Sequence, residues 1–430
     1  MKTFHLLLFV IFGASLLNAQ VINVPTDQSS IQAAIEAAAE GDTIIVEEGL
    51  YYENINFLGK AITLASHFIL DGDTAHISKT IIDGSQATHP DSASVVLMIS
   101  GEDTTSVLMG FTITGGKGSK HTMKYFGTNA TGLYGGGVAI NNSGGKILHN
   151  TIENNILEPG SNLEEILGGG LTAIVNNNHS LIIRANIIRN NSVSGPYANG
   201  GGAFLGGGRI VIEKNIISGN EVFSKNVGGG AGLFWADFNN SGVINEAIIR
   251  ENIISHNIGK SESNLFLGGG VALNFEIGEE SVKVYNNIIT DNYSEGYGGG
   301  IYLYITQATL FNNTIWNNES KLGGNSIGIL GPSNIEMFNN IIRSDAENNI
   351  PDFAFTDFGN SSCYFWYNIL KEKLTEDKVM VRGNSYKEPV FLPDSYDLAE
   401  DSPGIGWGVD KVEIDGTMYF APPSDMKGNK

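Results

Sequence analysis

The chain has a single cysteine, Cys363, among its 430 residues. One cysteine cannot form a disulfide bond within the chain, so the fold must be held together by non-covalent contacts alone. Cys363 lies five residues before Asn368, at a position that the asparagine repeat of this chain predicts to face inward. We therefore expect a buried packing residue rather than a reactive thiol.

Basic residues are also scarce. The sequence has 25 Lys and Arg residues against 46 Asp and Glu residues, which gives a formal net charge of −21. Such a charge makes nucleic acid a poor partner. It would also repel an anionic polysaccharide unless cations bridged the two, whereas it would help to keep a long protein soluble.

Long hydrophobic runs are missing after the first twenty residues, so no later segment is expected to span a membrane. Residues 1–19 have the features of a secretory signal peptide: Lys2 near the start, an apolar stretch from Leu6 to Leu17, and the small residue Ala19 at the cleavage site. We therefore expect a protein that is secreted, to the extracellular space, the cell surface or the periplasm, with no membrane span after signal cleavage.

What the sequence does contain is a repeat of Asn, any residue, Ile, two residues and Asn. Its complete copies are Asn150/Ile152/Asn155, Asn186/Ile188/Asn191, Asn215/Ile217/Asn220, Asn252/Ile254/Asn257, Asn287/Ile289/Asn292 and Asn313/Ile315/Asn318. A seventh copy, Asn340/Ile342, ends in Asp345, and a degenerate eighth copy starts at Asn368. A repeat of about 30 residues is typical of a solenoid.

Each repeat also contains a glycine triple and three short segments in which apolar residues alternate with other residues. The triples begin at Gly135, Gly168, Gly200, Gly228, Gly268 and Gly298. Period-two alternation predicts three short strands per coil, with the Asn-x-Ile segment as the third. Stacked coils would place the Asn residues in two columns, in which each side-chain amide donates to the next one and accepts from the previous one.

The coil motif Ile147-x-x-Asn150-x-Ile152-x-x-Asn155 resembles that of the right-handed parallel β-helix proteins, the pectate-lyase-like superfamily. The resemblance extends over about residues 21–410. It implies an all-β fold, a single-stranded right-handed parallel β-helix of about ten or eleven coils. It says little about activity, because many chemistries share this scaffold.

The two ends of the chain fit a capped stack. Ser29-Ser30, followed by an apolar-periodic segment from Ile31, predicts a short N-terminal helix that covers the first coil. We assign residues 1–19 to the signal peptide, 20–410 to the β-helix domain and 411–430 to a C-terminal tail, which we expect to be less ordered.

Aromatic residues on the first strands are the best candidates for a binding surface. Alternation predicts that Phe204, Phe234, Tyr302 and Tyr304 point outward, with Trp235 at a strand end. Flat aromatic faces along a groove suit sugar rings. The alternative is that neighbouring loops cover them.

Carboxylates beside these aromatics are weaker candidates. Asp237 and Glu276 could take part in glycoside hydrolysis if a second carboxylate lay at a suitable distance. Asp237, Asn239 and Glu246 could bind Ca²⁺ through hard oxygen ligands. The simpler interpretation, which we favour, is a solvated acidic loop.

Lys214 is the remaining catalytic candidate, because a lyase of this fold needs a base and Lys can serve. However, Arg184, Glu213 and Arg250 occupy equivalent positions in successive coils, which favours a cross-strand charge ladder. The motifs typical of pectate lyases (Trp-Ile-Asp-His) and of polygalacturonases (Asn-Thr-Asp, Asp-Asp and Arg-Ile-Lys) are missing.

One apolar column is unexpected. The residue after the column Asn is Ile187, Ile216, Ile253 and Ile288 in four successive coils, and it should face outward. Insert loops would cover this strip, or it would be a partner surface. Our leading hypothesis is a protein that interacts with a polysaccharide or a cell-surface glycan, with cleavage by a lyase or a hydrolase as a further possibility. The alternative is a non-catalytic structural or adhesive surface module.

Overall fold

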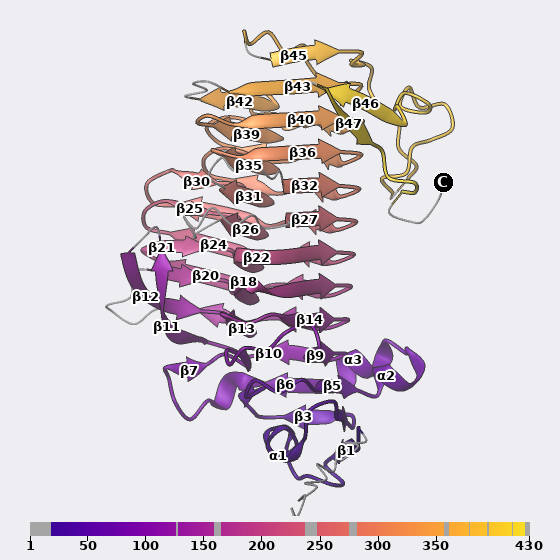
Figure 1. The fold of residues 1–430 in the computed structure, drawn as a ribbon. Coiled ribbons are helices and arrows are strands. Elements are labelled where there is room, and N and C mark those ends of the chain that lie inside the picture. Colours follow the sequence, from indigo (N-terminus) through magenta and orange to yellow (C-terminus); the bar gives the residue numbers. More distant parts are fainter. Residues whose placement is uncertain are drawn as a thin grey trace, which may run out of the picture.

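The computed structural model describes residues 19–125, 128–158, 165–236, 247–274, 282–356, 361–377, 379–393, 395–414 and 416–425. These residues form a parallel β-helix, in which short strands of successive coils lie above one another (Figure 1). First and second strands belong to one 21-stranded sheet, and third strands form an 11-stranded sheet. The described part of the chain therefore has one third strand in each of eleven coils, at the upper end of the predicted number.

Three strands per coil were predicted, and they form three columns. The first strands are β4 (Ile55–Asn56), β8 (Val96–Met98), β13 (Val138–Asn141), β18 (Leu171–Arg184), β22 (Ala203–Glu213), β26 (Leu233–Ala236), β31 (Val271–Asn274), β35 (Ile301–Tyr304), β39 (Ile327–Leu330) and β42 (Phe353–Thr356). The second strands are β1 (Val21–Val24), β2 (Thr43–Val46), β5 (Thr63–Ser66), β9 (Val107–Met109), β14 (Gly145–Leu148), the ends of β18 and β22, β27 (Ala247–Arg250), β32 (Val282–Tyr285), β36 (Gln307–Phe311), β40 (Asn334–Phe338), β43 (Ser362–Trp366) and β45 (Val379–Arg382). The third strands are β3 (Gly49–Tyr51), β6 (Thr80–Asp83), β10 (Thr112–Thr114), β15 (Thr151–Glu153), β19 (Ile187–Arg189), β23 (Ile216–Ser218), β28 (Ile253–Ser255), β33 (Ile288–Thr290), β37 (Thr314–Trp316), β41 (Ile341–Arg343) and β44 (Ile369–Leu370).

Many coils also contain two shorter strands that the alternation did not predict. After the second Asn of the repeat come β16 (Ile156–Leu157), β20 (Ser192–Gly195), β24 (Glu221–Ser224), β29 (Ile258–Ser261), β34 (Tyr293–Ser294) and β38 (Glu319–Ser320). Before the first strands come β7 (Ser92–Ala93), β11 (Gly118–Tyr125), β12 (Thr128–Tyr134), β17 (Glu165–Leu167), β21 (Tyr197–Asn199), β25 (Gly228–Gly229) and β30 (Phe266–Leu267). Most of them are two to four residues long, which is too short for a period-two pattern to be read.

The two asparagine columns are confirmed. In the first column, each amide from Asn150 to Asn340 donates through Nδ2 to Oδ1 of the next Asn, at 2.9–3.2 Å. The second column, from Asn155 to Asn318, has the same bonds at 2.9–3.0 Å. These side chains are at most 1% exposed. The ladder therefore satisfies buried amides that would otherwise be costly.

Bends before the first strands depend on glycine. Gly168 has a φ of +69°, in the left-handed region that favours glycine. A Cβ at Gly170 would lie 2.6 Å from the carbonyl oxygen of Gly202 in the next coil. In one coil the structural triple is Gly230-Ala231-Gly232 rather than the predicted Gly228-Gly229-Gly230, because Gly230 takes the left-handed conformation and Gly228–Gly229 forms β25.

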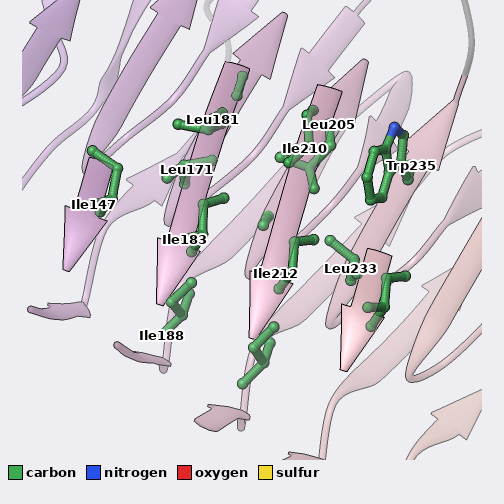
Figure 2. Close-up of a cluster of buried hydrophobic side chains, with 14 of the residues drawn as sticks. Ile147, Leu171, Leu181, Ile183, Ile188, Leu205, Ile210, Ile212, Leu233 and Trp235 are labelled. Atoms are coloured by element: carbon green, nitrogen blue, oxygen red, sulfur yellow. The ribbon is translucent and has the colours of Figure 1, made fainter. Parts of the chain in front are cut away.

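The interior is filled by apolar side chains that repeat from coil to coil. Ile147, Ile183, Ile212 and Ile249 lie opposite one another in neighbouring second strands and are at most 1% exposed. Figure 2 shows side chains from successive strands pointing into the same interior. Burying an isoleucine stabilises the fold by roughly 1.5–3 kcal/mol, so the column contributes substantially. Cys363 is part of this core, as expected.

The N-terminal end is covered by α1 (Ile31–Ala37), as predicted. Ser30 is its N-cap, and its hydroxyl accepts a hydrogen bond from the backbone N–H of Ala33. Ile31 and Ile35 are fully buried against the first coil. Two further short helices, α2 (Phe68–Asp71) and α3 (Ala75–Lys79), and the 3₁₀ helix η1 (Gly84–Gln86) were not predicted.

The expectation of a less ordered tail beyond Asp410 is wrong for the described residues. The antiparallel hairpin of β46 (Lys411–Ile414) and β47 (Thr417–Phe420) packs beside β36 and β40 (Figure 1). Val412 and Ile414 are buried against Phe311 and Phe338. The alternation of apolar residues in so short a hairpin could not predict that it packs against the column of Phe311 and Phe338.

Replacing a ladder residue should destabilise the whole stack. Asn252→Ala removes four hydrogen bonds, two accepted from Asn215 and one donated to each of Asn287 and Ile212. We expect the free energy of unfolding in urea to fall by at least about 3 kcal/mol, because buried partners are left unpaired. Asn226→Ala, at an exposed position, serves as the control and should change it by less than about 0.5 kcal/mol. Equal effects of the two substitutions would contradict this account.

Asp352 should make stability depend on pH. Burial raises its pKa to about 7, while Lys371 opposes the shift only in part. Between the unfolded value near 3.8 and about 7, the folded state holds a proton that the unfolded state has released. The free energy of unfolding therefore falls as pH rises through this range, on the order of 4 kcal/mol in all and on the order of 3 kcal/mol between pH 5 and pH 8. Urea denaturation at pH 5 and pH 8 should show this fall in the wild type and in the exposed control Asp345→Asn, but not in Asp352→Asn.

Candidate functional site

The predicted aromatic surface faces away from the main core but is not exposed. Phe204, Phe234, Ala272 and Tyr302 lie opposite one another in β22, β26, β31 and β35. The Phe204 and Phe234 rings stack with centroids 5.3 Å apart and an interplanar angle of 4°. Both rings and Tyr302 are at most 8% exposed, in a second apolar cluster with Leu167. The alternative, that neighbouring segments cover these rings, is the arrangement found.

Trp235 does not belong to this surface, and the prediction that placed it there is wrong. Its side chain is fully buried in the main core, together with Leu233 and Leu205 (Figure 2). The reason is the strand's period of two, which puts Trp235 on the inner face when Phe234 is on the outer face. What stays open beside the aromatic column is a recess of about 230 Å³, lined by Phe234, Leu267, Ala272, Leu273, Asn274, Tyr302, Tyr304 and Leu330.

Among the candidate catalytic and metal-binding residues, the structure describes only Lys214. Asp237, Asn239, Glu246 and Glu276 lie outside the described residues. Within the described ranges, no three His, Cys, Asp or Glu side chains gather closely enough to hold a metal ion. Lys214 lies at the bend between the second and third strands, and its Nζ is 3.5 Å from Oε2 of Glu251 in the next coil. It therefore lies on a different side of the coil from the aromatic column.

Arg184, Glu213 and Arg250 form the cross-strand charge ladder that we favoured. Glu213 is 2% exposed and pairs with Arg184 on one side and with Arg250 on the other, where Nε of Arg250 is 2.6 Å from Oε2. Although burial works against ionisation, hydrogen bonds from the two arginines hold the pKa of Glu213 below its usual value. The same outward column continues as stacked rings of Tyr285, Phe311 and Phe338, with centroids 4.7 and 5.1 Å apart.

The apolar isoleucine strip lies on the outer face of the third strands, as predicted. Ile187, Ile253, Ile288 and Ile341 are half-buried, and Ile216 is 40% exposed. Part of the C-terminal segment lies across from Ile253, Ile288 and Ile341 and lines a hollow together with them. We call residues 385–425 the C-terminal arm. The segment that lies opposite these isoleucines is therefore neither an insert loop nor a partner chain. The alternation of apolar residues could not identify it in the sequence.

Contacts at several levels of the stack hold the arm in place. The Phe391 ring meets the Trp316 ring edge-on, with centroids 4.9 Å apart. The Tyr396 hydroxyl lies 2.9 Å from Oγ1 of Thr290 and donates to Asp291 at 3.3 Å. Further down the arm, Nδ2 of Asn339 donates to the carbonyl oxygen of Val409 at 2.8 Å, and Nδ2 of Asn286 donates to that of Ser424 at 2.9 Å.

Between the arm and the third strands lies a hollow, which we call the arm groove. It has a volume of about 700 Å³ and is lined by Ile253, Asn286, Asn287, Ile288, Asn312, Asn313, Thr314, Asn339, Ile341, Ser395, Tyr396, Asp397, Leu398, Ile405, Gly408 and Asp425. A neighbouring hollow of about 300 Å³ shares Asn312 and Asn339 with it. The arm groove thus combines an apolar floor with amide, hydroxyl and carboxylate groups on its walls.

Sequence reasoning missed this site, although one signal was present. Asn286, Asn312 and Asn339 each precede a ladder Asn in three successive coils, and all have φ between +55° and +58°. Asn tolerates the left-handed conformation, so an Asn at such a bend needs no functional explanation. Asn154 and Asn190 occupy similar left-handed positions directly before residues of the second asparagine column. An Asn that precedes a ladder Asn therefore does not by itself indicate a binding site.

Truncating the apolar anchor of the hairpin should loosen the wall of the arm groove. Val412→Ala removes contacts with the Phe338 cluster and should lower the docking free energy of the hairpin by about 1–2 kcal/mol. Amide hydrogen exchange of β46 and β47 should then speed up, whereas exchange in β22 and β27 should not change. Met418→Ala, at a 42% exposed position of the same hairpin, is the matched control. Unchanged exchange in Val412→Ala would show that the hairpin is held by other contacts.

No helix among the described residues has the length and apolarity that a membrane crossing requires. Comparison with known proteins gives no match to a family model. No curated protein and no solved structure is significantly similar to the chain either. A function for this chain must therefore be inferred from its own geometry.

Proposed function

We propose that this protein binds carbohydrate and that a neutral glycan binds in the arm groove. The observation that carries the proposal is the groove itself, about 700 Å³ in volume, with an isoleucine floor and a row of amides. Ligand sites are typically clefts of this size, mostly apolar, with a few placed polar groups. Sugars match such a surface because they have apolar C–H faces and hydroxyl groups at their edges.

The amide row supports this assignment. Asn286 and Asn339 use their side chains to hold the arm, through Ser424 and Val409. Asn312, between them, has an Oδ1 that is buried without a hydrogen-bond partner among the described residues. A buried carbonyl oxygen without a partner costs roughly 1–3 kcal/mol, and a sugar hydroxyl would satisfy it.

Charge favours a neutral ligand over an anionic one. Asp397 and Asp425 line the arm groove, and the whole chain carries a formal charge of −21. A uronate polymer would be repelled by this potential. Neutral sugar hydroxyl groups can instead donate hydrogen bonds to carboxylate oxygens, and such charge-assisted bonds are strong.

Secretion and family membership belong to the same proposal. We place the protein outside the cytoplasm, on the basis of the signal-peptide pattern of residues 1–19. We place the chain in the pectate-lyase-like superfamily, on the basis of its coil motif and its asparagine ladders. We assign no cleavage step, because the candidates Asp237 and Glu276 lie outside the described residues and Lys214 pairs with Glu251.

Binding should depend on the amide of Asn312. A panel of immobilised neutral and uronate polysaccharides would identify a ligand, and titration calorimetry would then compare variants. Asn312→Gly removes the amide and keeps the left-handed backbone, so affinity should fall roughly five- to tenfold without loss of stability. Asn190→Gly is the matched control, because Asn190 is a left-handed Asn at an exposed bend outside the groove.

Two outcomes would contradict the proposal. Equal affinity of Asn312→Gly and Asn190→Gly would place the glycan elsewhere on the protein. The lack of binding to every polysaccharide would favour the alternative, a structural or adhesive surface module. Release of reducing ends from the same panel, with and without Ca²⁺, would show in addition whether the bound polymer is cleaved.

A further inference from the structure

A gap interrupts the aromatic stack on the outer face of the first strands. Phe204 and Phe234 stack in adjacent coils, with centroids 5.3 Å apart. The next coil has Ala272 at the equivalent position, and the coil after that has Tyr302. One ring of the column is therefore replaced by a methyl group.

The gap has the dimensions of one planar ring. Adjacent parallel strands lie about 4.8 Å apart, so the strands of Phe234 and Tyr302 are separated by two such spacings, about 9.6 Å. Stacked aromatic rings prefer centroid separations of about 4.5–7 Å. The recess of about 230 Å³ lies at this place and has Ala272, Phe234 and Tyr302 among its lining residues.

The lining of the recess is mainly apolar, and one lining residue, Tyr302, carries an unsatisfied polar group. Tyr302 is 3% exposed, and its hydroxyl is buried without a hydrogen-bond partner among the described residues. Burial also raises the pKa of this hydroxyl, so it stays protonated and can donate. Leu267 and Leu330 are half-buried parts of the same lining.

We propose that this recess, which we call the ring slot, binds a small phenolic molecule whose ring continues the stack between Phe234 and Tyr302. The phenolic hydroxyl would pair with the Tyr302 hydroxyl, and the ring would lie over Ala272. A pyranose fits less well, because its several hydroxyls would meet mostly leucine and aromatic carbon, and each unpaired one costs roughly 1–3 kcal/mol. The site is separate from the arm groove, with which it shares no lining residue.

The test uses the full chain and two isosteric probes, phenol and toluene, with affinities measured by ligand-observed NMR titration. Wild-type protein should bind both probes. Ala272→Phe supplies the missing ring and should abolish binding of both. Tyr302→Phe should lower the ratio of phenol affinity to toluene affinity roughly fivefold, because it removes only the hydroxyl.

Controls keep the outcomes distinct. Circular dichroism and thermal unfolding should show that Ala272→Phe is folded, and Ala272→Leu is a smaller filling substitution if it is not. Binding that persists in a folded filled variant, or a phenol-to-toluene ratio unchanged in Tyr302→Phe, would overturn the proposal. Binding of methyl glucoside, but of neither probe, would overturn it as well and would identify the recess as a sugar site.

Discussion

The amide-to-amide hydrogen bonds of the two asparagine columns determine how the coils stack. Each ladder Asn donates to one neighbour and accepts from another. A shift of one coil by one residue would therefore leave buried amides on both sides without hydrogen-bond partners. The register is therefore fixed at the bends and not by the length of the chain between them. Consecutive ladder residues are 29 residues apart from Asn186 to Asn215 and 37 apart from Asn215 to Asn252, yet the hydrogen bonds are the same length.

Features with a local cause were predictable from the sequence. The inward Ile of each Asn-x-Ile segment, the outward direction of Phe204 and the N-cap at Ser30 each follow from strand period or from capping chemistry, and the structure has them. The short strand β25 could not be predicted, because two glycines carry no pattern. For the same reason the position of the structural glycine triple, at Gly230, was assigned two residues too early.

Features with a distant cause were not predictable. The burial of Phe234 depends on segments such as β30, which approach it only once the coils are stacked. The docking of Val412 against Phe338 joins positions far apart in the sequence, and no periodicity connects them. The arm groove is a product of that docking, so its lining residues could not be grouped beforehand. The ring slot is intermediate, because the position of Ala272 between the aromatic residues Phe234 and Tyr302 is recognisable only when the register is known.

The contacts of the C-terminal arm also change how the stack can come apart. Repeat proteins lose their terminal units first, because each unit contacts only its neighbours. Here Trp407 donates to Gly383 near the last strand, Val409 bonds to Asn339, and Ser424 accepts from Asn286 in a coil still further from that end. The last coils cannot fray singly while these bonds hold, so they open and close together as one cooperative unit.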